Sequence, residues 1–400
     1  MKIRPSSFFS RKRKRPHMTD RTFPDMTDAL RLTRAGKLME ATSLIQRVLR
    51  GGQPASAGIG PVIIDAEFTA GPGAGETPDP RAKGPHMERP HASLRETVTR
   101  VVAMAREFAA DTRGQPEPLP EGASFTTAAY ANGAGTRHYK LYVPANRAAE
   151  HAPLIVMLHG CTQNPDDFAA GTRMNVLAEE HGFLVAYPQQ TMRANMRQCW
   201  NWFRPEDQRR GQGEPSLIAG LTETVIREHG VDPKRVYIAG LSAGGAAAAI
   251  MGDAYPDLYA GVGVHSGLPS ASARDLSSAF DAMRLGAKVG APSATLVPTI
   301  VFHGEKDNIV NPLNADAVAA KAVGGATGLQ RETEHGEAAG GHAYVRTLYA
   351  DETGRTLCEL WRIPESGHAW SGGSPAGSHT DPLGPDASRE MVRFFFQHTK

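Results

Sequence analysis

Apolar and polar positions alternate along residues 120–400 with two different periods. Continuous apolar runs that end in glycine or proline, such as residues 153–160 and 183–188, are typical of parallel strands buried on both faces. Between the runs, apolar residues recur at helical spacing and stop at glycine, as over residues 166–182 and 216–230. This alternation predicts an α/β protein with a mainly parallel sheet and helices on both faces.

The same pattern places the remaining elements. A hairpin is expected around the Asn132-Gly133 turn, and two strands are expected on either side of the turn at residues 351–354. Three more buried strands are expected at residues 235–240, 261–267 and 295–304, and helices are expected before residue 295 and at 313–322 and 388–398.

Residues 1–119 have a different pattern and are expected to form an extension that precedes a domain at 120–400. One or two amphipathic helices are expected near residues 27–51 and another at 93–111. Residues 51–91 are rich in glycine, proline and alanine without a period, so we expect a disordered linker there. The basic run at 11–15 is typical of a solvated tail, with a nuclear-targeting or nucleic-acid tract as the alternative.

Composition changes this picture little. A net charge of +2 over 400 residues gives no overall attraction for nucleic acid, and no apolar run is long enough to span a membrane. The three cysteines, at 161, 199 and 358, lack the paired spacing of a zinc site, so we expect no metal and no cofactor. The basic N-terminus is not followed by the apolar core of a standard signal peptide, and the sequence gives no oligomeric state.

The candidate chemistry begins at residues 240–244, Gly-Leu-Ser-Ala-Gly, which match the G-x-S-x-G motif. In this motif a strand turns directly into a helix, the serine takes a strained backbone conformation, and small neighbours let the chain pass. An apolar strand precedes Ser242 and an alanine-rich helix pattern follows it, which is the context that the motif requires. Ser242 is therefore the candidate nucleophile.

A serine nucleophile needs a base, and the base needs an orienting carboxylate. When a G-x-S-x-G serine is followed by Asp or Glu and then His, each partner comes from a loop after a strand. Asp307 follows the strand that ends at residue 304, with Glu305 as its nearest rival. His368 follows the last expected strand, whereas His342 and His379 fit that position less well.

Two backbone amides are expected to stabilise the oxyanion of the transition state. One is the amide of Ala243, directly after the serine. The other comes from the loop after the strand at residues 153–160, where Cys161 is the first candidate and Gly160 the second.

Four stretches, at residues 158–190, 199–203, 240–245 and 367–373, together resemble the polyhydroxybutyrate depolymerase family of esterases, the type with an extracellular catalytic domain. The resemblance covers roughly residues 125–398. It implies an α/β-hydrolase fold, a triad of Ser242, Asp307 and His368, and an oxyanion hole at the amides of Ala243 and Cys161.

The resemblance also implies that Cys161 and Cys199 flank the site and can form a disulfide, which a cytosolic setting would keep reduced. Secreted members of the family begin with a signal peptide, whereas this chain begins with a basic tail. Extracellular and cytoplasmic locations therefore both stay open. No separate substrate-binding domain is expected after the catalytic part, so work on crystalline polymer stays an open question.

An aromatic segment offers candidates for substrate binding. Trp200, Trp202 and Phe203 lie in a polar, irregular segment, and Trp370 is close to His368. Aromatic faces suit an apolar ester chain, and an indole N–H can hold a carbonyl. The alternative is that these tryptophans are packed in the core.

These features predict a serine esterase that hydrolyses short-chain polyhydroxyalkanoate, such as polyhydroxybutyrate, or its oligomers through an acyl-enzyme. A feruloyl or acetyl (xylan) esterase with the same triad is the alternative. A non-catalytic granule-binding protein is the third hypothesis. The expected partner is a polyester or other ester substrate; no nucleic acid and no membrane span are expected.

Overall fold

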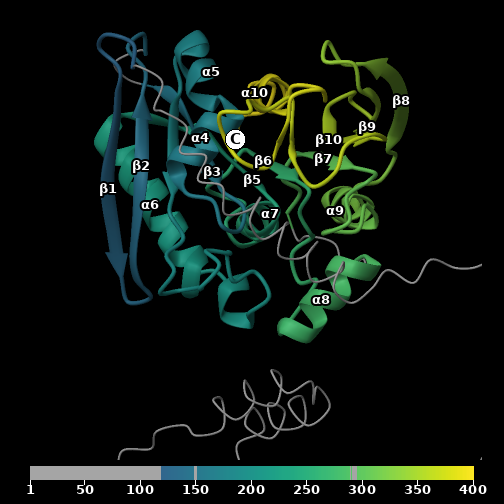
Figure 1. Ribbon diagram of the computed structural model, residues 1–400, viewed down its shortest axis with the longest axis horizontal. Coiled ribbons are helices and arrows are strands. Elements are labelled where there is room, and N and C mark those ends of the chain that lie inside the picture. The colour runs from purple at the N-terminus through teal and green to yellow at the C-terminus, as the bar shows by residue number, and fades with distance from the viewer. Residues whose placement is uncertain (1–118, 148–150, 289, 291–294) are drawn as a thin grey trace, which may run out of the picture. The chain divides into compact units, whose positions relative to one another are not determined.

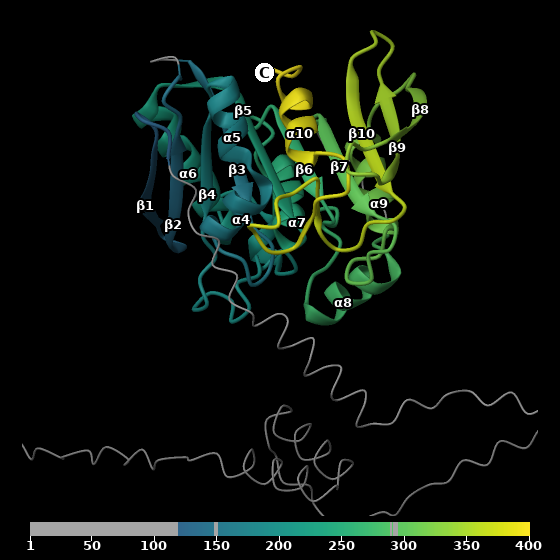
Figure 2. The ribbon, with the colours of Figure 1, turned by 45° about the horizontal axis from the view of Figure 1, so that its top comes forward.

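The computed structural model describes residues 119–147, 151–288, 290 and 295–400 (Figures 1 and 2). Its centre is one ten-stranded sheet, with a separate pair of two-residue strands. The strands of the large sheet are β1 (Ser124–Asn132), β2 (Gly135–Val143), β3 (Ala152–Leu158), β4 (Leu184–Pro188), β5 (Val231–Leu241), β6 (Gly261–His265), β7 (Thr299–Gly304), β8 (Gln330–Glu337), β9 (Ala343–Ala350) and β10 (Thr356–Ile363). The short pair is β11 (Trp370–Ser371) and β12 (Thr380–Asp381).

The large sheet has the order β1-β2-β4-β3-β5-β6-β7-β10-β9-β8. Its six central strands, from β4 to β10, run parallel, and the strands outside them pair antiparallel. The β1–β2 hairpin closes where Asn132 pairs with Gly135, around the expected Asn-Gly turn. Every residue of β3 is buried, as its apolar run predicts.

Helices cover both faces of the sheet. They are α4 (Pro165–Thr172), α5 (Met174–His181), α6 (Gly213–His229), α7 (Ala243–Ala254), α8 (Leu276–Leu285), α9 (Leu313–Val323) and α10 (Ala387–Phe395), with a short 3-10 turn η1 (Pro205–Gln208). Alternate residues of β3 separate the two layers: Ile155 joins the core under α4, α5 and α10, whereas Val156 joins the core under α6, α7 and α9. The prediction of an α/β sheet with helices on both faces is therefore confirmed (Figure 1).

One helix prediction was wrong. The single helix expected at residues 166–182 is two helices, α4 and α5, separated at Arg173. Arg173 has a left-handed backbone with φ 54°, and its N–H closes α4 by donating to Ala169 O. The side chain of Thr172 donates to Phe168 O, one turn back, which competes with continuation of the helix.

Strand β8 was missed because its sequence contains no apolar alternation. Nearly all of its residues are exposed, and it is held by backbone pairing to β9 along its whole length. Such a strand is set by its neighbour rather than by its own hydrophobic pattern. The expected extension at residues 1–119, with its helices and linker, lies almost entirely outside the described residues. In the part that the structure describes, no helix combines the length and apolar character needed to cross a membrane.

Candidate active site

Ser242 occupies the sharp turn between β5 and α7 that its motif predicts. Its backbone has φ 57° and ψ −119°, a combination that residues other than glycine rarely adopt. The close approach requires glycine at position 244, where a Cβ atom would lie 2.0 Å from Leu158 O. Ser242 is half-buried. Its backbone N–H donates to His265 O at 2.8 Å.

The structure brings Asp307 and His368 into direct contact from loops 61 residues apart. His368 Nδ1 lies 2.7 Å from Asp307 Oδ2, and the two loops follow the adjacent parallel strands β7 and β10. Because a carboxylate only accepts hydrogen bonds, Nδ1 of His368 carries the proton. The other ring nitrogen, Nε2, is then available to accept a proton.

Asp307 sits in an environment that favours its charged form. Burial alone opposes the charge, but hydrogen bonds from His303 and His368 outweigh it and hold the pKa of the Asp307 carboxyl well below its ordinary value. Its other oxygen, Oδ1, accepts from the N–H groups of Ile309 and Val310, both at 2.9 Å. The rival carboxylate, Glu305, instead lies 3.7 Å from the guanidinium of Arg362.

His265, at the end of β6, joins the serine turn to the loop that carries His368. Its carbonyl accepts from Ser242 N–H, and its ring Nε2 accepts from Ser371 N–H at 2.9 Å. The ring is fully buried and stacks on Phe302 and Trp370, and burial lowers its pKa well below the ordinary value. The neutral ring thus bonds to the His368 loop, and its carbonyl bonds to the serine turn.

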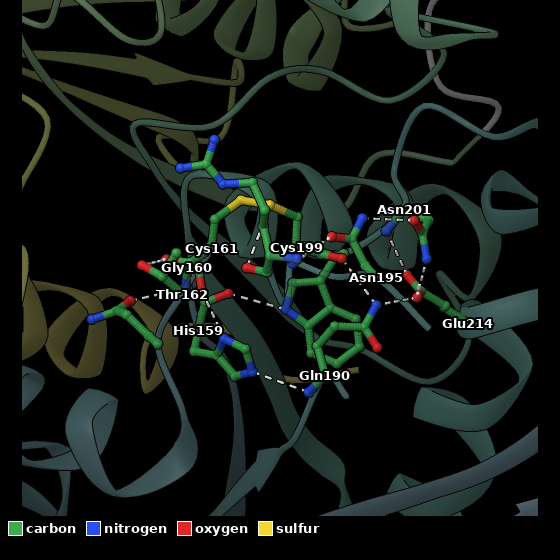
Figure 3. The surroundings of a disulfide bond; sticks show 12 residues. His159, Gly160, Cys161, Thr162, Gln190, Asn195, Cys199, Asn201 and Glu214 are labelled. Atoms are coloured by element: carbon green, nitrogen blue, oxygen red, sulfur yellow. Dashed lines mark hydrogen bonds between the residues drawn. A yellow bond between two sulfur atoms is a disulfide. The ribbon is translucent and has the colours of Figure 1, made fainter. Parts of the chain in front are cut away.

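The loop after β3 is fixed from two sides (Figure 3). A disulfide joins Cys161 to Cys199, as the resemblance implies, and Thr162 N–H donates to Arg197 O at 2.7 Å. Gly160 N–H is already taken by Gln163 Oε1 at 2.9 Å, which leaves Cys161 as the better candidate for an oxyanion donor. The N–H of Ala243, the first residue of α7, has no partner within its own helix.

A buried polar network holds the segment that carries Cys199 (Figure 3). Glu214 accepts from Asn201 N–H at 2.8 Å and from the side chain of Gln190, and it lies 3.6 Å from Arg137. Gln190 N–H in turn donates to His159 Nε2 at 3.0 Å. The residues that follow β4 are therefore tied both to the core and to the loop that carries Cys161.

The three tryptophans predicted to bind substrate are buried instead. Trp200 and Trp370 are 0% and 1% exposed, and Trp202 is 6% exposed. The indole N–H of Trp200 donates to His159 O, and that of Trp370 donates to the hydroxyl of Ser388. The N–H groups of Trp200 and Trp370 are used within the fold, and the burial of all three side chains favours the alternative that these tryptophans are packed in the core.

Sequence reasoning also missed a residue that touches the candidate acid. His303 Nε2 lies 3.3 Å from Asp307 Oδ2 and 2.9 Å from Val310 O. His303 stands in the apolar run that forms β7, and the only signal for its role is its position four residues before Asp307. No three His, Cys, Asp or Glu side chains group to hold a metal ion in the described part of the chain.

Comparison with known families decides the relationship. The sequence profile described as Esterase PHB depolymerase matches residues 137–339, about half of the chain. The chain belongs to this family. The resemblance carried by the four sequence stretches is thereby confirmed, and residues 240–245 lie within the matched region.

Individual relatives of this PHB depolymerase family member are named as ester hydrolases as well. Poly(3-hydroxyalkanoate) depolymerase C of Paucimonas lemoignei is 34% identical over 58% of this chain and 57% of its own length. Feruloyl esterase B of Neurospora crassa is 33% identical over 34% of this chain and 46% of its own length. The chain thus spans about half the length of these curated relatives.

A solved structure agrees on the fold. An acetyl xylan esterase from Aspergillus awamori superposes with a TM-score of 0.51 at 19% identity, covering 68% of this chain and 99% of that one. The predicted α/β-hydrolase fold is confirmed.

Proposed function

We propose that this chain is a serine-dependent carboxylic ester hydrolase. The observation that carries the proposal is the hydrogen-bonded Asp307–His368 pair, whose histidine loop is joined through His265 to a serine on a strained strand-to-helix turn. In the proposed reaction, His368 Nε2 takes the proton of Ser242 as its oxygen attacks the ester carbonyl, forming a tetrahedral intermediate. The imidazolium then protonates the leaving alcohol as the ester C–O bond breaks.

Water completes the proposed cycle. It attacks the acyl-Ser242 ester and gives a proton to His368, which returns that proton to Ser242 Oγ as the acyl C–O bond breaks, so the acid and the free serine are released. The amides of Ala243 and Cys161 are the proposed donors to the oxyanion in both halves, and each such donor contributes about 3 kcal/mol of barrier lowering. Asp307 stays ionised and stabilises the imidazolium, which its lowered pKa favours.

For the substrate we propose short-chain polyhydroxyalkanoate or its oligomers. The relative of highest identity given above is named as a depolymerase of this polyester. Apolar side chains also lie exposed on two segments that belong to or bond to the candidate site. Met192 and Met196, 69% and 90% exposed, precede Arg197, whose carbonyl bonds to the loop of Cys161, and Ile309, two residues after Asp307, is 49% exposed. Exposed apolar side chains beside a site suit a hydrophobic polyester better than a hydrated polysaccharide. The feruloyl and acetylxylan esterase relatives support the second candidate, a feruloyl or acetyl ester on xylan.

The test compares the full chain with its Ser242→Ala variant on several esters. The panel contains amorphous poly(3-hydroxybutyrate), its trimer, p-nitrophenyl butyrate, and feruloylated and acetylated xylan. We expect release of 3-hydroxybutyrate and labelling of Ser242 by a fluorophosphonate, both lost in the variant. Preferred release of ferulate or acetate would favour the second candidate. Activity that survives Ser242→Ala would refute the serine mechanism, and polymer binding without hydrolysis would favour a granule-binding protein.

A further inference from the structure

His303, the penultimate residue of β7, makes contacts that a simple core residue would not need. It is 1% exposed, and its Nε2 faces two acceptors, Asp307 Oδ2 at 3.3 Å and Val310 O at 2.9 Å. Because a carboxylate and a carbonyl can only accept, Nε2 must carry the proton. Nδ1 of the same ring is buried and has no hydrogen-bond partner in the part of the chain that the structure describes.

The carboxylate of Asp307 consequently has three hydrogen-bond donors and a fourth N–H close by, that of His303, which bonds to Val310 O and also lies 3.3 Å from Oδ2. Oδ1 accepts from the backbone of Ile309 and Val310, and Oδ2 faces both His368 Nδ1 at 2.7 Å and His303 Nε2 at 3.3 Å. The two imidazoles therefore share one oxygen. A second donor on that oxygen fixes the plane of the carboxylate and reduces the negative charge that it offers to His368.

We propose that His303 is a positioning residue, which shares Asp307 Oδ2 with His368 and so sets both the orientation and the basicity of the His368 ring. The inference rests on the proposed function, because it concerns the same acid and base. His303 does not touch the substrate in this scheme. It acts through Asp307 alone.

The direction of the effect follows from the shared oxygen. Without the His303 donor, Asp307 interacts more strongly with His368, so the imidazolium form of His368 becomes more favourable. The acidic limb of the kcat/KM profile, which reports this protonation, then moves to higher pH. The other titratable groups close to His368 are the rings of His265 and His379, whose pKa values are both lowered first by burial. Burial therefore favours the neutral form of both rings.

The decisive variants are His303→Phe, which keeps a ring of similar shape but removes the donor, and His303→Gln, which supplies an amide donor. We expect His303→Phe to lower kcat roughly tenfold, as expected for a lost hydrogen bond to a charged group. We expect its acidic limb to rise by roughly half a pH unit, and His303→Gln to restore the limb. In an Asp307→Asn background, His303→Phe should have no further effect on kcat, because its route of action is gone.

A second measurement needs no turnover. The Nδ1 proton of His368, bonded to Asp307, gives a downfield proton NMR signal whose position and pH midpoint report the pair directly. His303→Phe is expected to change both the position and the pH midpoint of this signal. The matched control is His398→Phe, at a buried histidine of the C-terminal segment, which is expected to change neither. His398 is 2% exposed, and both of its ring nitrogens lack a hydrogen-bond partner among the described residues.

The outcomes separate cleanly. A folded His303→Phe protein with an unmoved acidic limb and an unmoved His368 signal overturns the inference, as does a full additional loss of kcat in the Asp307→Asn background. A His303→Gln protein that behaves like His303→Phe also overturns it. If the wild-type chain hydrolyses no ester, the proposed function fails, and the NMR comparison still decides whether His303 acts on the Asp307–His368 pair.

Discussion

Acid is expected to weaken the fold through His159, because this ring accepts a hydrogen bond that only a neutral imidazole can accept. His159 Nδ1 lies 2.7 Å from Gly160 O and must donate to it, so Nε2 is left unprotonated and accepts from Gln190 N–H at 3.0 Å. Protonation would place two N–H groups face to face in the core. Burial accordingly lowers the pKa of His159 from 6.5 to about 4.

The size of the effect follows from this difference between the folded and unfolded proteins. Between the two pKa values the unfolded chain binds more protons at this residue than the folded chain, so stability falls as the pH falls. With an unfolded pKa of 6.5 and a folded pKa of about 4, the loss of unfolding free energy is about 2 kcal/mol at pH 5 and about 3 kcal/mol at pH 4. Below the folded pKa the loss levels off.

The assay is chemical denaturation of the wild type and His159→Gln at a series of pH values between 7 and 4. We expect the variant to be less stable at pH 7, since it loses the ring's contacts, but to lose about 2 kcal/mol less than the wild type on going to pH 5. The control is His138→Gln, at an exposed position of β2. It is expected to lose as much unfolding free energy between pH 7 and 5 as the wild type. Parallel losses in wild type and His159→Gln would refute the reasoning.

Two further predictions concern the site. Asp307→Asn is expected to lower kcat by a factor on the order of 10³–10⁴ with a small change in KM, because an amide stabilises neither the required tautomer of His368 nor its imidazolium. Steady-state kinetics check this prediction. An effect confined to KM would contradict it. Cys199→Ser opens a loop with a sequence separation of 38, which is expected to lower the unfolding free energy by about 4 kcal/mol and to lower kcat as the Cys161 amide loosens. Thermal melts and kinetics with and without a reductant check this prediction. In the wild type, the reductant should lower stability and kcat as Cys199→Ser does. Cys358→Ala, which lacks only the free cysteine, should respond to the reductant like the wild type. An unchanged kcat after reduction would count against the role of Cys161.

The sequence was sufficient for features that depend on neighbouring residues. The buried central strands follow from continuous apolar runs such as that of β3, and the serine turn follows from the small residues around Ser242, where a Cβ at position 244 would collide with Leu158 O. The fold class could be predicted because both signals are local. The pairing of Cys161 with Cys199 could be anticipated only from family resemblance, since no spacing rule implies it.

What the sequence could not show depends on contacts between distant segments. Trp200 looked available for substrate because its segment is polar, but a carbonyl 41 residues away satisfies its N–H and lets it be buried. Likewise, His303 is hidden in an apolar run. Its contact with Asp307 exists because the chain reverses directly after β7, where Asp307 N–H donates to Gly304 O.

The outermost strand has a consequence for how copies of this protein meet. Among the described residues, no strand pairs with the outer edge of β8, and along that edge stand Arg331, Glu332, Glu334 and Glu337, all exposed. A strand from another molecule that tried to extend the sheet would bring its side chains against these charges and strip them of water. The polar border therefore discourages fibre-like stacking of one sheet edge on another.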